Sequence, residues 1–180
     1  MSVAIYQLKY PIGPFTKPEP LDGRVVASAI DTIASFPTKL RLAVATLTSE
    51  QLDTPYRPEG WTVRQVVHHC ADSHMNSFIR FKLALTEDAP IIKPYYEDRW
   101  AELADTKALD ITYSLILLDG LHARWAALLR SLEPTALKRV FIHPEQGKQL
   151  ALDEATALYA WHCEHHLAHI TTLKDSKNWT

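Results

Sequence analysis

Cysteine and glycine are both scarce in this chain of 180 residues. The two cysteines, Cys70 and Cys163, form no C-x-x-C pair, which argues against a disulfide scaffold and leads us to expect reduced, buried thiols. The five glycines form neither a G-x-G-x-x-G loop nor a P-loop, and no G-x-S-x-G element occurs. The sequence therefore disfavours nucleotide binding and the nucleophile elbow of the α/β-hydrolases.

Long apolar runs and an excess of either charge are also absent. No segment approaches the roughly 18 consecutive apolar residues of a membrane-spanning helix. The first 15 residues lack the basic segment and the apolar run of a signal peptide, so we expect a cytoplasmic protein without membrane contacts. With 19 basic and 21 acidic side chains and a net charge of -2, a nucleic-acid partner is not expected either. The length predicts one hydrophobic core.

Proline is concentrated near the start of the chain, at Pro11, Pro14, Pro18 and Pro20. Each proline fixes φ and removes a backbone donor. We therefore predict that residues 1–21 form an extended arm rather than a helix, lying across the domain or across a partner subunit. Residues 22–180 are predicted to form a single domain.

Apolar residues recur every three or four positions in four long segments, the spacing of one helix face. The predicted helices cover residues 22–47, 62–85, 111–132 and 153–173. Pro37 interrupts the first, where we expect a kink or a restart. Thr62 and Gln65 form a capping box at the start of the second, and Asp153 is the predicted N-cap of the last.

Shorter elements connect these helices. Thr48 to Gln51 form another capping box, which predicts a short helix, and residues 97–104 predict a second one. Val140–His143 and Gln149–Leu152 flank residues 144–148 and predict a small hairpin. The whole pattern predicts an all-α protein, an up-and-down four-helix bundle with a hairpin before the last helix.

Most of the nine histidines lie in two short segments, HHCADSH and HCEHHLAH. Winding the last helix at about 100° per residue places His162 and His166 on the inward, apolar face. His165 and His169 have the same spacing, but their pair is centred on the edge of that face, although His169 itself lies inside it. Two imidazoles one turn apart can bind the same metal ion, and we prefer the first pair because it is the one centred on the inward face.

The second helix offers a third ligand, His69, in a polar stripe with Ser73, Asn76 and Arg80, with Asp72 beside it. His69 facing the pair in the last helix gives three imidazoles with coordination positions left open, the pattern of a catalytic metal site. Imidazole suits zinc and nickel and does not rule out iron or copper.

Simpler interpretations stay open for each of these residues. A histidine pair at this spacing is often a coincidence, the short polar side chains could form a hydrogen-bonded cluster, and Arg80 could be an ion-pair partner. His68 should point away from His69. His74, His122 and His143 are interpreted as ordinary surface or core residues, and the cysteines as packing residues.

Three segments carry a family resemblance: LDTPYRPEGWT, WTVRQVVHHCADSHMNSFIRFKLAL and LYAWHCEHHLAHITTL. They resemble the DinB superfamily, and specifically its YfiT-like branch, whose members are often described as metal-dependent hydrolases. The resemblance implies a four-helix bundle, often a homodimer, that holds a divalent metal through three histidines. Carried over by position, these ligands are His69, the second histidine of its pair, with His162 and His166.

The resemblance implies two kinds of reaction. Members of the superfamily include hydrolases, and also S-transferases and isomerases that use thiols such as bacillithiol. In either case the metal would lower the pKa of a bound thiol or water for attack on a small electrophilic or hydrolysable substrate. Arg80 and Ser73 are the predicted thiol-binding residues, with Arg80 orienting a carboxylate. Asp72 would orient His69 or accept a proton.

Asn76 joins Asp72 and Arg80 in the predicted catalytic set, as a polar residue of the same stripe. Two other classes stay open at this point. One is a metal-stabilised binding or stress-response module without turnover, and the other is a plain bundle whose histidines are core residues.

Overall fold

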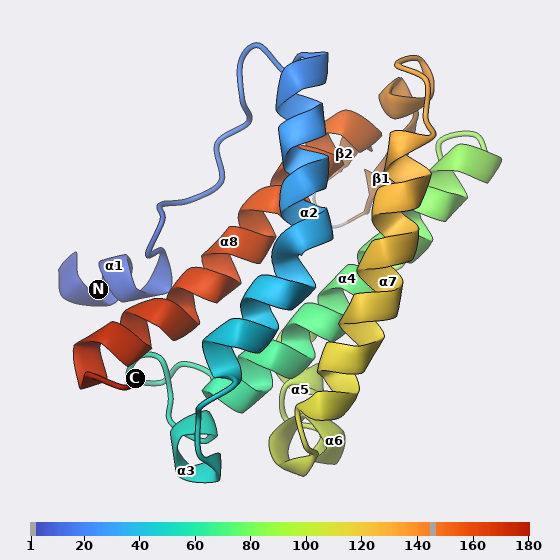
Figure 1. Ribbon diagram of the computed structural model, residues 1–180. Helices are drawn as coiled ribbons and strands as arrows, with labels where there is room; N and C mark the ends of the chain where they lie inside the picture. Colours follow the sequence, from blue (N-terminus) through green and yellow to red (C-terminus); the bar gives the residue numbers. More distant parts are fainter. Residues whose placement is uncertain (1–2, 145–146) are drawn as a thin grey trace.

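The computed structural model describes residues 3–144 and 147–180, and it is dominated by four long helices (Figure 1). In chain order the elements are α1 (Val3–Lys9), α2 (Gly23–Val44), α3 (Ser49–Leu52), α4 (Val63–Thr86), α5 (Glu97–Trp100), α6 (Ala104–Ala108), α7 (Thr112–Arg130), the 3-10 turn η1 (Ala136–Lys138), β1 (Val140–His143), β2 (Lys148–Ala151) and α8 (Leu152–Lys177).

The predicted four-helix bundle is confirmed. Helices α2, α4, α7 and α8 pack around one core, whose largest fully buried side chains include Trp125, Phe36 and Phe81. Each helix buries apolar side chains against the others, which supplies most of the stabilisation of such a fold. No helix in the described part of the chain is both long and apolar enough to cross a membrane.

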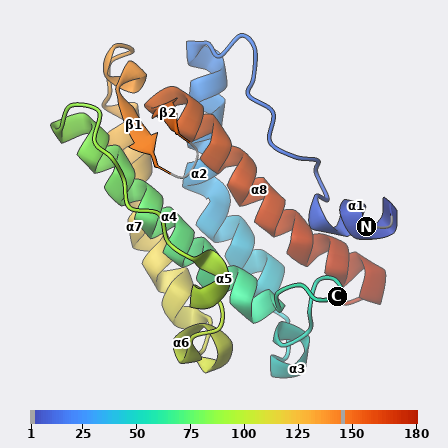
Figure 2. The same ribbon diagram turned by 180° about the vertical axis from the view of Figure 1, so that it is seen from behind.

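The directions of the helices differ from the predicted up-and-down order. Helices α4 and α7 run parallel: His68 contacts Ser114, His74 contacts His122 and Phe78 packs on Trp125. The connection between them, residues 87–111, returns the chain to the end of the bundle where α4 began (Figures 1 and 2). A long crossover permits this order, whereas short loops impose antiparallel neighbours.

The predicted start of α4 is confirmed. The Thr62 side chain accepts a hydrogen bond from the Gln65 backbone N–H at 3.1 Å, and the Gln65 side chain accepts one from the Thr62 N–H at 2.9 Å. This capping box fixes the rotational phase of the helix from its first turn. Two turns later, His69 faces His162 and His166 of α8.

The predicted N-cap of the last helix is wrong. Helix α8 begins at Leu152, its N-cap is Ala151, and no side chain caps it. Asp153 lies inside the first turn, buried, and pairs with Lys138. The strand β2 leads straight into the helix, and an acidic residue in the first turn still interacts favourably with the helix dipole.

Helix α2 continues through Pro37 without a restart. Proline lacks an N–H, so the carbonyl four residues earlier, that of Ile33, loses its helical donor. Ile33 is fully buried, so this carbonyl needs another partner inside the core.

The prediction of an extended arm over residues 1–21 is wrong for its first part. Val3–Lys9 form helix α1, which is possible because no proline occurs before Pro11. Beyond α1 the chain is irregular and lies along α8, where the Trp161 indole donates to the Gly13 carbonyl at 3.1 Å and Lys17 pairs with Glu154. Residues 1–2 lie outside the described residues.

The connecting elements agree with the predictions, with one difference. The predicted short helix over 97–104 is two separate helices, α5 and α6. The hairpin is present, with Val140 opposite Ala151 and His143 opposite Lys148. Of its predicted turn, residues 145–146 lie outside the described residues.

Candidate metal centre

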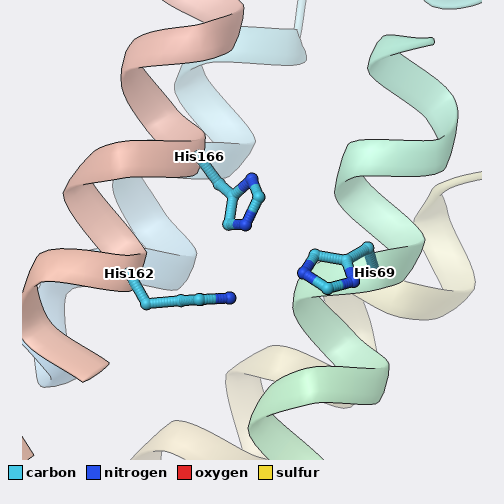
Figure 3. Close-up of side chains that lie close together, drawn as sticks. All are labelled: His69, His162 and His166. Carbon is cyan, nitrogen blue, oxygen red and sulfur yellow. The ribbon is translucent and has the colours of Figure 1, made fainter. Parts of the chain in front are cut away.

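Three histidines from two helices converge at one point between α4 and α8 (Figure 3). Their ring centroids are 5.4 Å apart for His69 and His162, 4.8 Å for His69 and His166, and 4.4 Å for His162 and His166. One nitrogen from each ring lies within 4.8 Å of the other two. The structure thus brings together the set expected from helical winding and from the resemblance.

The hydrogen bonds show which nitrogen faces this point. Nδ1 of His162 lies 2.9 Å from Nε2 of His74, and Nδ1 of His166 lies 3.4 Å from Nδ1 of His169. The nitrogens left for a ligand are therefore the two Nε2 atoms, and in Figure 3 each ring directs a nitrogen into the shared space. The Ser73 hydroxyl, at 3.4 Å from Nε2 of His162, borders the same space.

Burial keeps these imidazoles neutral. It lowers the pKa of His69 to about 3 and lowers the pKa values of His162 and His166 well below their ordinary range, with neighbouring histidines adding to the effect. A neutral imidazole carries the lone pair that binds a metal ion. Three such rings gathered in a buried space fit a divalent ion such as zinc or nickel.

The second pair considered from the sequence forms a neighbouring group. His165, His166 and His169 also place one nitrogen each within 4.8 Å of the others. Nε2 of His169, however, donates to the Lys9 carbonyl at 3.1 Å, and its ring stacks on Tyr56 with centroids 3.9 Å apart. The ring of His169 is thus hydrogen-bonded through both nitrogens, whereas His69 has a nitrogen free to bind.

Two histidines interpreted from the sequence as ordinary residues adjoin the centre. His74 and His122 are fully buried and hydrogen-bonded to each other at 2.8 Å, and His74 continues to His162. His122 could have been noticed, because it lies in the middle of the apolar stripe of α7, where a polar ring needs a partner. Its partner could not be identified without knowing which helices are neighbours.

A cavity of about 440 Å³ opens directly onto the three histidines. Besides the ligands, its wall includes the cations Lys9 and Arg57 and the aromatic side chains of Tyr10, Tyr56, Trp61 and Trp161. A small molecule bound there would touch the centre on its open side.

A second cavity, of about 650 Å³, has His162 in its wall but neither His69 nor His166. Ser73 and Arg80 both line it, so the structure places these two predicted binding residues on one wall. His143 lines it too, which the sequence analysis missed, because its position depends on how the hairpin packs on α4. Glu97 borders both cavities, and burial raises the pKa of its carboxyl group.

Asp72 and Asn76 are less closely associated with the centre. The Asn76 amide donates to the Asp72 backbone carbonyl at 2.8 Å. Within the described ranges, the Asp72 carboxylate makes no hydrogen bond to His69. Burial, with Asp105 nearby, raises the pKa of Asp72 to about 6, so its carboxyl group changes protonation state close to neutral pH. Its catalytic role and that of Asn76 stay predictions.

The remaining assignments concern residues outside the centre. His68 points away from His69, with its nitrogens 2.7 Å from the Ser114 hydroxyl and 3.2 Å from the Leu109 carbonyl. Cys70 and Cys163 are free thiols, fully buried, and burial raises both pKa values. These thiols are protonated packing residues, as the sequence predicted.

Comparison with known families agrees with this architecture. Residues 33–170 match the family model described as the DinB superfamily. A protein of Bacillus mycoides (strain KBAB4) is 54% identical over 172 residues, covering 96% of this chain and 98% of its own length. A protein of Bacillus cereus (strain B4264) is 55% identical over the same length with the same coverage. Both carry the name "Putative metal-dependent hydrolase".

A solved structure is similar over the same extent. YfiT from Bacillus subtilis superimposes with a TM-score of 0.94 at 50% sequence identity, covering 97% of this chain and 99% of that one. It is described as a probable metal-dependent hydrolase with an unusual four-helix bundle topology.

Proposed function

Since the chain belongs to the DinB superfamily, we propose that it is an enzyme that uses one divalent metal ion held by His69, His162 and His166. The observation that carries the proposal is the convergence of three neutral imidazoles at the boundary of two cavities. Names of the relatives support metal dependence. Zinc and nickel suit the imidazole donors best.

Two reactions are consistent with such a centre, hydrolysis and the transfer of a thiol to an electrophile. When bound, the metal supplies a Lewis acid that lowers the pKa of a thiol or a water. In transfer, sulfur forms the new bond to carbon, and the leaving group departs with the electron pair of the bond that breaks. The thiol proton must then reach a base, and Asp72 is our candidate for it.

The second cavity favours the thiol reaction. Arg80 offers a guanidinium group that can bind a carboxylate through two parallel hydrogen bonds, and Ser73 offers a hydroxyl between that wall and His162. A thiol cosubstrate with carboxylates, of the bacillithiol kind, would have its acid groups bound by Arg80. This arrangement would direct its sulfur towards the three histidines.

Activity assays on the metal-loaded protein test the proposal. The protein is loaded with zinc or nickel and incubated with a small electrophile, with and without bacillithiol. Turnover that requires the thiol supports transfer, and turnover in water alone supports hydrolysis. His162→Ala should abolish turnover and stoichiometric metal binding, whereas His68→Gln should preserve both. A His162→Ala protein that keeps bound metal and activity would contradict the proposal.

Arg80 has a matched control in the same cavity. Arg80→Gln should raise the KM for the thiol about tenfold or more, the effect of losing one charged hydrogen-bonded pair. Arg99 lines the same cavity but lies over the Tyr96 ring, so Arg99→Gln should change this KM much less.

The alternative is a metal-stabilised module without turnover. It would bind one metal per chain and gain stability from it, but none of the electrophiles would be consumed. The open cavities beside the histidines favour the enzyme, because a purely structural site has its coordination sphere closed by the protein. The homodimer and the cytoplasmic location stay predictions of the sequence.

A further inference from the structure

Buried histidines are linked in series by hydrogen bonds, and this series begins at a backbone carbonyl. Nδ1 of His122 lies 2.6 Å from the carbonyl oxygen of Ile33. This carbonyl has no helical donor, because the residue four positions later is Pro37. A carbonyl oxygen can only accept a hydrogen bond, so the proton in this contact resides on Nδ1 of His122.

The position of the proton on His122 determines the proton positions on the other histidines of this series. In neutral His122, Nε2 must accept, so His74 donates from Nδ1 at 2.8 Å. Nε2 of His74 must then accept from Nδ1 of His162 at 2.9 Å. His162 is left with a lone pair at Nε2, the nitrogen that faces the metal centre.

A second series of hydrogen-bonded histidines ends at the backbone of the N-terminal segment. Nε2 of His169 donates to the Lys9 carbonyl at 3.1 Å, so Nδ1 of His169 accepts. Its nearest partner is Nδ1 of His166 at 3.4 Å, which must therefore carry the proton. His166 also presents its lone pair at Nε2.

We propose that His74 and His122, on one side, and His169 with the Lys9 carbonyl, on the other, are positioning residues that hold His162 and His166 in the Nδ1–H tautomer. The proposal rests on the proposed metal centre and extends it beyond the three ligands. Free histidine prefers the opposite tautomer, with the proton on Nε2, which would block the metal. The two series of hydrogen bonds remove this competing form before any metal arrives. They also engage both nitrogens of His169, which leaves the group of His165, His166 and His169 without three free nitrogens for a second metal.

The tautomers can be observed directly in the wild-type protein without metal. Two-bond nitrogen–hydrogen correlation NMR of uniformly labelled, chelator-treated protein distinguishes Nδ1–H from Nε2–H rings. His162, His166, His74 and His122 should show the Nδ1–H pattern, and His169 the Nε2–H pattern. An Nε2–H pattern for His162 or His166 would overturn the proposal, whatever the result of the metal-binding experiments.

Variants then test whether the tautomer matters for the metal. His74→Leu removes the acceptor for His162 and should weaken zinc binding by about 10- to 100-fold in chelator competition, the usual effect of losing a partner of a metal-binding histidine. His74→Gln keeps an acceptor and a donor and should restore most of the affinity. His68→Leu replaces a buried histidine of the same helix that bonds elsewhere and should leave the affinity unchanged.

The outcomes separate the two proposals. Wild-type affinity in His74→Leu would overturn the positioning role, while absence of zinc from the wild type would overturn the metal centre alone. If His74→Leu fails to fold, the NMR pattern of the wild type still decides. Pro37→Ala offers a milder test, because it restores an N–H that competes for the Ile33 carbonyl and should mix the tautomers of His122.

Discussion

The two sides of the metal centre are built differently. On the α8 side, His162 and His166 are each hydrogen-bonded through Nδ1 to another histidine, and each chain of bonds ends on a backbone carbonyl. On the α4 side, His69 packs against Trp61 with ring centroids 4.6 Å apart. Its ring has no hydrogen-bond partner within the part of the chain that the structure describes.

This difference separates two ways of placing a ligand. Hydrogen bonds fix both the orientation and the protonated nitrogen of a ring, whereas a ring contact restricts only its orientation. We infer that α8 provides the preorganised half of the centre. On the α4 side the ring contact restricts the orientation of His69, and its tautomer is determined only when a metal binds.

Removing the metal should have the largest effect on stability. Variants on the α4 side and on the α8 side allow the two sides to be compared. At a free metal concentration 1,000 times Kd, bound metal should raise the free energy of unfolding by about 4 kcal/mol. His69→Ala and His162→Ala should both abolish this gain, as measured by urea unfolding with zinc and with chelator. Without metal, the free energy of unfolding of His162→Ala should be about 1 kcal/mol lower than that of His69→Ala, because His162→Ala also removes the hydrogen bond to His74. Equal metal-free stabilities would contradict the comparison.

Acid should destabilise the metal-free protein through the α8 side. Burial lowers the pKa of His122 from 6.5 to about 4, so between these pH values the unfolded chain binds a proton that the folded chain does not. Stability therefore falls as the pH drops, by about 1.4 kcal/mol per unit for each such histidine. His122→Gln should flatten the dependence by about 2 kcal/mol between pH 6.5 and pH 5, as measured by urea unfolding.

Asp72 acts in the opposite direction over part of this range. Its raised pKa, about 6, means that the folded chain binds a proton before the unfolded one does, which adds stability as the pH falls. Asp72→Asn should therefore steepen the loss of stability.

The His122 prediction has its own contradicting outcome. If His122→Gln leaves the dependence of stability on pH unchanged, the ring of His122 is not buried as a neutral group.

The smallest effect should come from the α4 side. Trp61→Ala removes a ring contact worth about 0.5–1.5 kcal/mol, so zinc affinity should fall by less than about tenfold, and Trp61→Phe should recover part of it. Chelator competition measures both. A loss larger than that of His74→Leu would reverse the order of the two sides.

Much of this architecture could be predicted from local patterns. The capping box at Thr62 and the apolar spacing of the last helix were enough to orient His69, His162 and His166, because each depends only on its own helix. Asp153 was misassigned because a helix entered directly from a strand needs no side-chain cap. The α1 helix was missed because the prolines that exclude a helix begin only at Pro11.

The roles of His74 and His122 could not be predicted in the same way. They depend on α4 and α7 lying parallel and adjacent, and the apolar spacing of a helix does not contain its direction in the bundle. The position of the Lys9 carbonyl against His169 depends likewise on how the N-terminal segment docks on α8. Long-range packing decides these contacts.

The proline in the middle of α2 suggests a rule for protein design. A helix placed in an apolar interior normally offers no spare acceptor, since its own amides occupy every carbonyl. One proline, placed four residues after the chosen position, frees a single carbonyl oxygen whose place along and around the helix axis is known. A designer who needs an imidazole locked in one orientation could build that anchor from the main chain, without introducing a carboxylate and its charge.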